Sequence, residues 1–429
     1  MADPSEPAPP DCRVPIEVPA LIDRATHPIF IAAWLANLAI VTANTATFVF
    51  AEWVATLAKE GTTAAAYHEE LPGRVIQFGV MAALCVRLFL GQAIDRFGVR
   101  RVWLLMSLLA FCGMWIFTFL TAVSYWLFVG RILFAVGLAG MFTSGTFHIQ
   151  SCVSDHRRTE FIALLGSSGF VGMMLGPQLA ALLRSICKDQ LQAYSTIFGT
   201  ACTLILAYIG CILLATHRLP VPPQPETRPS LLVLTRRYWP GTVMLVSMAM
   251  GVVFTVPSLY LVRFNQHEKF GGIATYWTTY AVSAFVFRIA TASLSQQIGR
   301  HRMILLGLVA QGLGLWALLP VTAWWHLIFS ALLCGFGHAL LFPSIVSLGS
   351  GSFPPQYRGS GTNLTLGFLD LGAGLSAPLL GRIIDLQRYQ GVGYRPMFFC
   401  AGGVPLIIAL IWLITQRHGS DHEIRTAAS

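Results

Sequence analysis

Long apolar runs, each bounded by short polar segments, fill the chain from about residue 29 onwards. A helix that crosses a bilayer needs about 20 mostly apolar residues. The pattern predicts twelve such helices, six on each side of the Pro-rich, basic segment 217–239. They cover residues 29–55, 73–95, 102–123, 125–151, 159–183, 193–216, 240–262, 273–297, 303–322, 325–350, 359–384 and 395–416. The sequence therefore predicts an all-α membrane protein with two six-helix bundles, 29–216 and 240–416.

The composition favours the same class of protein. Of the 429 residues, 55% are hydrophobic and only 11% are charged, and the mean hydropathy is +0.65. Soluble proteins carry about 25% charged residues, so this chain has too little polar surface to cover a water-soluble globule. The nine cysteines contain no C-x-x-C pair and indicate neither a disulfide framework nor a metal site. We expect a protein of the lipid bilayer, with no nucleic-acid partner, metal or cofactor.

The positive charges predict how the chain is oriented. Lys and Arg are more frequent in the segments on one side of the predicted spans, and such segments lie in the cytoplasm. We therefore expect a cytoplasmic N-terminal tail (1–28), linker (217–239) and C-terminal tail (417–429). The N-terminal segment is polar and Pro-rich, unlike a signal peptide. Only three of the 28 basic residues are lysine, which favours a bacterial protein and hence the cytoplasmic (inner) membrane.

An internal repeat relates the two sets of spans. The stretch VRLFLGQAIDRFGVRRVWLL begins at residue 86, and FRIATASLSQQIGRHRMILL begins at residue 287. Both stretches join the second and third predicted spans of their half. The ungapped alignment superposes Arg87 with Arg288, Gly98 with Gly299, and Arg101 with Arg302. Two parallel six-helix halves related by an axis along the membrane normal are an architecture of secondary transporters.

The first of these stretches resembles the loop signature of the major facilitator superfamily. The matching residues are Gly91, Asp95, Arg96, Gly98, Arg100 and Arg101. The resemblance implies that the aspartate caps a helix in the neighbouring bundle and pairs with arginines, as a latch on the outward-facing state. We also expect Gly91 to mark a close helix contact. A cluster that only sets the membrane orientation is the alternative, although acidic residues contribute little to that rule.

Three further segments resemble this superfamily. Arg131, followed by Gly137, is similar to the arginine of the fourth-helix motif, although Ala135 replaces a glycine. The stretch GSSGFVGMMLGPQLA resembles the fifth-helix motif of drug/proton antiporters. Its core residues, Gly172, Gly176 and Pro177, predict a helix bend and imply export, while ordinary helix kinking is the alternative. The region FPPQYRGSGTNLTLGFLDLGAGLSAPLLG resembles the eleventh helix of bacterial efflux members, including the arabinose-efflux-like branch.

Three arginines lie inside the predicted spans. A charge within the bilayer is costly, and it usually faces a bundle interior or a watery cavity. Arg87 lies two turns before the loop signature, about 12 Å along the helix axis. Arg288 has the equivalent depth in the other half, and Arg131 lies nearer the outer face. We expect these side chains to bind an anionic substrate group or to pair with a carboxylate; hydrogen bonding to helix-end carbonyls is the structural alternative.

Few titratable groups inside the spans could carry a proton. Asp370, near the middle of the eleventh span, is the first choice. Burial raises the pKa of a carboxyl group and a nearby cation lowers it, so a change of surroundings could load and release a proton. A structural aspartate at a glycine-rich helix contact is its alternative. Glu52 is the second candidate, although it could extend to the outer interface. His338 is the third, and a hydrogen-bonded packing histidine is the more common role.

Polar residues on the first span predict one wall of a central cavity. Asn37, Asn44, Thr42 and Thr45 recur at spacings that place several on one helix face. With Trp34, Phe48 and Tyr260 available, such a cavity would suit an amphipathic organic solute.

These features predict a transporter and no enzyme. The chain has no P-loop, no H-E-x-x-H motif and no nucleophile elbow. We expect a monomeric secondary transporter that exports a small organic molecule in exchange for protons by alternating access. Drug-like amphiphiles and secreted metabolites such as siderophores are the candidate substrates. Proton-coupled uptake of a small nutrient is the first alternative, and a receptor or scaffold that transports nothing is the second.

Overall fold

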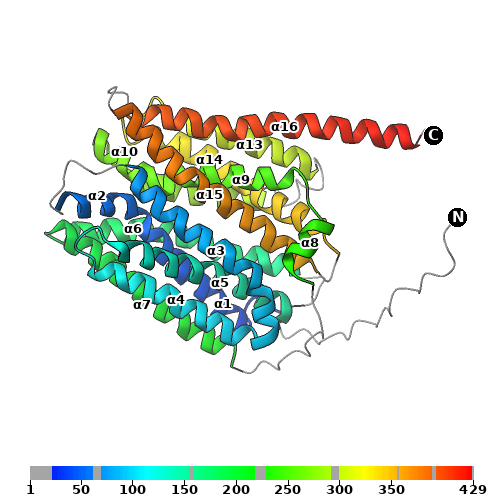
Figure 1. Cartoon of the computed structure of the whole chain (residues 1–429), viewed down its shortest axis with the longest axis horizontal. Coiled ribbons are helices and arrows are strands. Elements are labelled where there is room, and N and C mark those ends of the chain that lie inside the picture. Colours follow the sequence, from blue (N-terminus) through cyan, green and yellow to red (C-terminus); the bar gives the residue numbers. More distant parts are fainter. Residues whose placement is uncertain are drawn as a thin grey trace.

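The computed structural model describes residues 22–60, 69–153, 158–217, 229–290, 299–354, 357–388 and 393–427. Every regular element within these ranges is a helix. The long helices run side by side and form one elongated bundle (Figure 1). The prediction of an all-helical protein is confirmed.

The N-terminal half contains six long helical segments. The first consists of three consecutive elements, α1 (Pro28–Ala46), the short 3₁₀ helix η1 (Thr47–Val49) and α2 (Phe50–Glu60). Pro28 occupies the first position of α1, where its missing N–H group leaves no hydrogen bond unmade. The other five segments are α3 (Glu70–Phe97), α4 (Val99–Phe119), α5 (Tyr125–Cys152), α6 (Arg158–Ile186) and α7 (Gln190–Ala215).

The C-terminal half repeats this arrangement after the short helix α8 (Leu231–Arg237). Its first segment consists of α9 (Val243–Thr255), the π-helical turn η3 (Val256–Tyr260) and α10 (Leu261–Glu268). Like the first segment of the N-terminal half, it changes helix type part of the way along. The remaining helices are α11 (Ile273–Ala290), α13 (Arg300–Trp316), α14 (His326–Gly351), α15 (Arg358–Arg388) and α16 (Arg395–Ala427).

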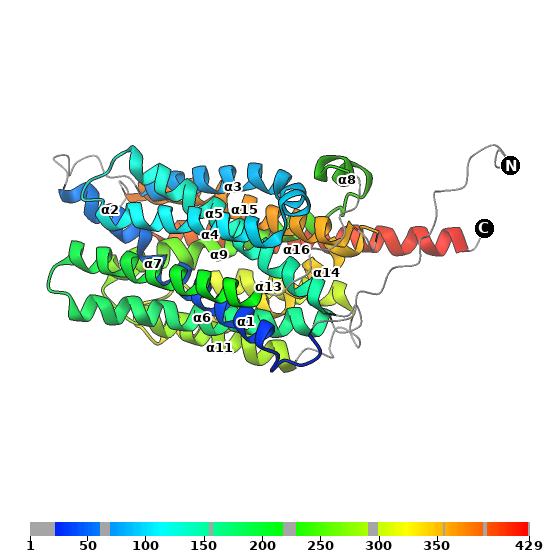
Figure 2. The same ribbon diagram turned by 90° about the horizontal axis from the view of Figure 1, so that it is seen from below.

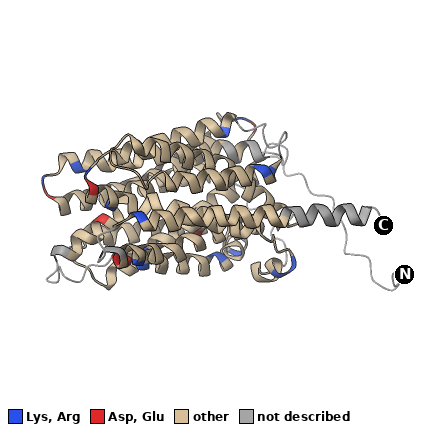
Figure 3. Ribbon diagram, turned by 90° about the horizontal axis from the view of Figure 1, so that it is seen from above, with Lys and Arg blue, Asp and Glu red and all other residues tan. Residues whose placement is uncertain are grey.

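The helices are suited to a bilayer. Ten helical segments of the described chain are long and apolar enough to cross one, with Pro28–Ala58 and Val243–Glu268 each counted once. The helices α11 and α13, of 18 and 17 residues, occupy two further predicted positions but lie outside this set. Charged residues lie mostly toward the two ends of the bundle (Figure 3). A multi-pass membrane protein is therefore confirmed, whereas the count of twelve spans stays a prediction.

Both predicted tails differ in part from the structure. Ile22, within the predicted tail 1–28, is buried among Phe30, Ile149 and Phe161, and its N–H donates to the Cys152 carbonyl at 3.0 Å. Residues 1–21 lie outside the described ranges. At the other end, α16 continues to Ala427, beyond the predicted end of the span at 416. No proline interrupts this stretch, so nothing in the backbone forces the helix to end with the apolar run.

Two glycines show that the repeat extends to backbone geometry. Gly98 separates α3 from α4 with φ 82° and ψ 147°, and Gly299 precedes α13 with φ 78° and ψ 154°. Only glycine adopts this region without strain. The aligned glycines therefore form the same turn in both halves.

The two halves meet along two pairs of helices. One pair is α3 with α15, and the other is α6 with α11. Each pair combines the second long helix of one half with the fifth of the other. We call these contacts the α3–α15 seam, visible in Figure 1, and the α6–α11 seam, visible in Figure 2. We call the end of the bundle near α8 the α8 end, and the opposite end, near α2 and α10, the α10 end.

Candidate functional site

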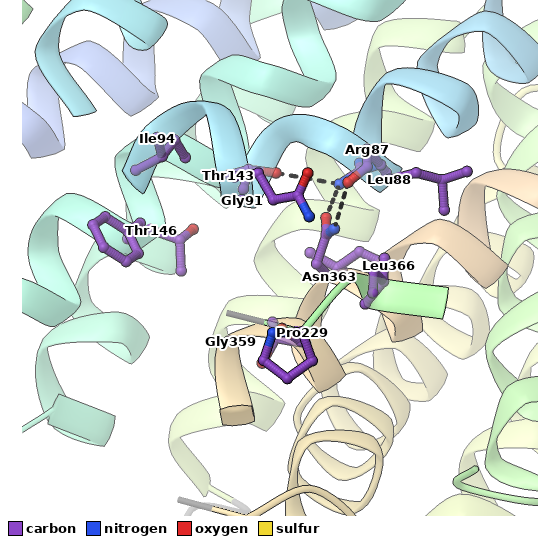
Figure 4. A pocket seen from close by; sticks show the side chains of 15 residues that line it. Arg87, Leu88, Gly91, Ile94, Thr143, Thr146, Pro229, Gly359, Asn363 and Leu366 are labelled. Atoms are coloured by element: carbon purple, nitrogen blue, oxygen red, sulfur yellow. Dashed lines mark hydrogen bonds between the residues drawn. The ribbon is translucent and has the colours of Figure 1, made fainter. Parts of the chain in front are cut away.

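Arg87 joins the two halves across the α3–α15 seam. Its Nη2 donates to Oδ2 of Asp370 at 2.7 Å, and its Nη1 donates to Oδ1 of Asn363 at 3.0 Å and to the Thr143 hydroxyl at 3.3 Å. Figure 4 shows Arg87, Thr143 and Asn363 turned toward one another. The Arg87 side chain is 7% exposed and that of Asp370 is 31% exposed. We call these four residues the Arg87 cluster.

The helix geometry explains why α15 supplies two of these partners. Asn363 and Asp370 are seven residues apart and therefore lie on one face of the helix, two turns from each other. The Asn363 side chain also donates to the Arg87 carbonyl at 3.3 Å. Gly367, which lies between them, faces the arginine stem, because a Cβ there would lie 3.9 Å from Arg87 Cδ. The sequence thus presents an amide and a carboxylate to one guanidinium.

A pocket lies beside this cluster and extends toward the α8 end. Its walls come from α3, α5, α15 and the segment that begins α8 (Figure 4). Arg87, Thr143 and Asn363 line it. Gly91 lines it too, and a Cβ at that position would meet no atom within 4 Å. The prediction that Gly91 marks a close helix contact is therefore wrong, because a small residue in the sequence does not reveal what faces it.

Polar side chains join the halves at the α10 end. Glu52, which is fully buried in α2, accepts from Arg184 of α6 at 2.6 and 2.8 Å and from Gln266 of α10. Glu69, beside the start of α3, pairs with Arg263 of α10. Because carboxylates of the N-terminal half bind donors of the C-terminal half, these contacts hold the two halves together here.

Further contacts close the same end. The carboxylate of Asp385 in α15 accepts the backbone N–H groups of Glu69 and Glu70 at 2.8 and 2.9 Å. A Cβ on Gly73 of α3 would come within 2.4 Å of the Ala377 carbonyl oxygen in α15. The two halves are therefore in close contact at the α10 end, whereas the pocket beside Arg87 lies toward the α8 end.

Arg288 has very different surroundings from Arg87. Its guanidinium lies 5.7 Å from the ring of Phe170 in α6 and 5.7 Å from that of Phe342 in α14. Among the described residues it has neither an acidic partner nor a hydrogen bond. His338 packs against the same two rings, and its Nδ1 lies 2.6 Å from the Tyr280 hydroxyl. Arg288 therefore lies between the halves without a counter-ion in this part of the chain.

Arg131 stays inside the N-terminal half. It lies over the rings of Phe50 and Phe134, at 5.4 and 5.7 Å, and its stem packs against the position of Gly79 in α3. Its Nε is buried and has no hydrogen-bond partner among the described residues. The structure therefore separates the three arginines that the sequence places within spans.

The predicted cavity-lining residues of the first span divide into two groups. The Asn37 amide donates to Ser168 at 2.8 Å and to the Leu165 carbonyl at 3.3 Å, which fastens α1 to α6. The Asn44 side chain makes no hydrogen bond among the described residues. Phe48, one turn further along, contacts Phe254 and Trp277 of the other half. The face with Asn44 and Phe48 therefore points toward the C-terminal half.

The glycines of the predicted bend motif form a helix contact. A Cβ on Gly176 would come within 2.1 Å of the Thr45 hydroxyl, and one on Gly172 within 2.8 Å of Val41. Thr45 also donates to the Gly172 carbonyl at 3.0 Å. The helix α6 continues through Pro177 without a break. The motif thus packs α6 against α1, and its link with export stays a prediction.

The predicted latch residues lie at the α8 end of α3 and α4. Arg96, Arg100 and Arg101 are exposed, and none of them forms an ion pair with a described residue. The side chain of Asp95 lies outside the described part of the structure, so the latch stays a prediction.

Most of the partners that define these sites were not predicted from the sequence. Asn363 could have been found from its seven-residue spacing to Asp370 on one helix. Arg184, Glu69, Arg263 and Asp385 lie near helix ends, where charged residues usually face water, so no sequence signal marks them as buried partners.

Comparison with known proteins identifies the family. The sequence profile of the Major Facilitator Superfamily matches residues 33–287 and 271–429. An uncharacterized MFS-type transporter of Salmonella typhimurium, STM4428, is 23% identical over 302 residues, which cover 68% of this chain and 72% of the relative.

Solved structures share the fold. A POT family transporter in complex with 5-aminolevulinic acid superposes with a TM-score of 0.71 at 13% identity, over 90% of this chain and 95% of that chain. A variant of the nucleoside transporter NupG gives a TM-score of 0.68 at 13% identity, over 89% of this chain and 99% of that chain. The family match, the transporter relatives and the apolar helical bundle lead to one conclusion: this chain belongs to the Major Facilitator Superfamily and is a membrane transporter, not an enzyme.

Proposed function

We propose that this transporter exports a small organic molecule in exchange for protons, with Asp370 as the group that carries the proton. The observation that carries the proposal is the ion pair between Asp370 and Arg87 across the α3–α15 seam. The Asp370 side chain is 31% exposed, so its carboxylate is not sealed from protons. The guanidinium keeps its charge at every physiological pH, so only the carboxylate of this pair can change charge.

Protonation of Asp370 would change the contact between the halves. A neutral carboxyl group loses its ion pair with Arg87, which weakens the α3–α15 seam near the α8 end. The closed arrangement of this seam is favoured when Asp370 is ionised. Proton binding therefore shifts the population toward states in which the halves separate here. A mobile equilibrium of this kind is what alternating access between two rocking halves requires.

The direction of transport rests on the resemblance of the fifth helix to drug/proton antiporters. With the predicted orientation, the hollow beside Arg87 opens to the cytoplasm and the closed α10 end faces outward. Molecules of the cytoplasm then have access to the pocket in the arrangement seen. An amphipathic molecule suits a lining that combines polar groups with apolar side chains.

Two experiments test this proposal. Small molecules in the culture supernatant and in cell extracts are first compared with and without the protein. A compound that leaves the medium only when the protein is present would reverse the proposed direction.

The exported compound is then used in proteoliposomes with a pH gradient. We expect Asp370→Asn to abolish gradient-driven accumulation while exchange of the compound persists. Glu70→Gln, which removes a carboxylate paired with surface Arg74, is the matched control. Full dependence on the gradient in Asp370→Asn would refute the role of Asp370.

A further inference from the structure

The repeat has a constant offset that reaches beyond the loop signature. Arg87 and Arg288 are 201 residues apart, and so are Gly98 and Gly299. The prolines inside α6 and α15, Pro177 and Pro378, have the same offset. Since α3 corresponds to α11 and α15 corresponds to α6, the α3–α15 seam and the α6–α11 seam are repeat-related copies of one contact.

The second copy lacks the carboxylate of the first. Asp370 neutralises Arg87, and the residue 201 positions before Asp370 is Gly169 in α6. Glycine has no side chain to offer Arg288. In the part of the chain that the structure describes, no Asp or Glu pairs with Arg288. The α6–α11 seam therefore retains the arginine of the repeat without its internal partner.

The surroundings of Arg288 leave its donors available. The rings of Phe170 and Phe342 contact the guanidinium, and none of its N–H groups bonds to a described residue. His338 uses Nδ1 toward Tyr280, and its Nε2 has no partner among the described residues. Arginine presents five N–H donors that match a carboxylate in a bidentate manner. The rings attract the guanidinium and so lower the free-energy cost of burying its charge, but they do not replace an anion.

We propose that the α6–α11 seam holds the substrate's anionic group: Arg288 binds the carboxylate of an aromatic or similarly planar molecule. Phe170 and Phe342 pack against the planar body, and His338 offers a further hydrogen bond through Nε2. The substrate thereby supplies the negative charge that Asp370 supplies in the other seam. This inference rests on the proposed transport function, and it adds the chemical class of the cargo and the site of its charged group.

The experiment measures ligand binding to the purified full chain in lipid nanodiscs. The probes are 2-naphthoate and its neutral counterpart 2-naphthamide, and titration calorimetry gives the affinities. We expect 2-naphthoate to bind the wild type at least about tenfold more tightly than 2-naphthamide, as charged hydrogen bonds differ from neutral ones. Arg288→Gln should remove this preference. Arg300→Gln, which changes an exposed arginine of α13, should keep it.

The outcomes are decisive in both directions. If 2-naphthoate does not bind the wild type, or if Arg288→Gln keeps the tenfold preference, the proposal is overturned. Size-exclusion profiles show whether each variant is folded, and Arg288→Lys, which keeps the charge, should retain part of the preference. Asp370→Asn separates this proposal from the transport function. Normal binding with lost proton coupling supports both, whereas lost coupling with binding insensitive to Arg288 overturns this proposal alone.

Discussion

The two seams between the halves contain the same arginine in opposite circumstances. In the α3–α15 seam, Arg87 is neutralised by Asp370 and hydrogen-bonded by Asn363. In the α6–α11 seam, Arg288 has aromatic rings around it and Gly169 at the position that corresponds to Asp370. The difference teaches that a repeated sequence can divide two tasks between its copies. In our proposal, one copy holds the halves together with an internal ion pair, and the other leaves an arginine for the anionic group of the substrate.

The largest expected effect is a difference in stability between the Arg87→Gln and Arg288→Gln variants. Arg87→Gln leaves Asp370 without its cation, and breaking a largely buried pair costs about 2–4 kcal/mol, less than for a fully buried one because Asp370 is one-third exposed. Arg288→Gln removes a charge with no internal partner and should leave the stability unchanged or raised. Thermal unfolding in detergent, followed by tryptophan fluorescence, measures both.

A second substitution checks the origin of this effect. Adding Asp370→Asn to Arg87→Gln removes the unpaired charge and should recover most of the lost stability. If Arg87→Gln and Arg288→Gln destabilise the protein equally, the two seams do not differ as described.

A smaller effect compares how closely the helices pack. Gly73→Ala in α3 would place a methyl group within 2.4 Å of the Ala377 carbonyl, and such overpacking costs about 1–3 kcal/mol. Gly169→Ala in α6 has room and should be neutral or slightly stabilising, since alanine favours a helix over glycine by up to about 1 kcal/mol. Urea or thermal unfolding of the two single variants provides the comparison. Equal losses would show that the α6 position is as crowded as the α3 position.

The smallest effect concerns the hydrogen bond that crosses the α6–α11 seam. Gln178 of α6 donates to the Thr278 hydroxyl of α11 at 2.9 Å. Its repeat-related residue in α15 is Leu379. Gln178→Leu should lower stability by about 0.5–1 kcal/mol, the usual net contribution of one such bond. Gln178→Glu tests whether this part of the seam tolerates a negative charge, and a loss above about 2 kcal/mol for Gln178→Leu would show that the bond has a larger role.

The sequence predicted the helices well because their signal is local. An apolar run of sufficient length predicts a span wherever it occurs. The alignment paired Gly98 with Gly299, and the structure shows that the two glycines form the same turn. The site was harder to predict. Arg87 and Asp370 are 283 residues apart, and only the packing of α3 on α15 brings them together. The loss of a partner for Arg288 depends on a glycine, which leaves no chemical signal of its own. The polar closure at the α10 end uses residues such as Glu52 and Arg184, whose pairing depends on where distant helix ends meet.

One measurement tests the division between the seams most directly: the affinity of the full-length protein for 2-naphthoate in Arg87→Gln and in Arg288→Gln. We expect Arg288→Gln to lose affinity by about tenfold or more and Arg87→Gln to stay close to the wild type, since Arg87 already has its anion. An equal loss in both variants, or a loss in Arg87→Gln alone, would contradict it.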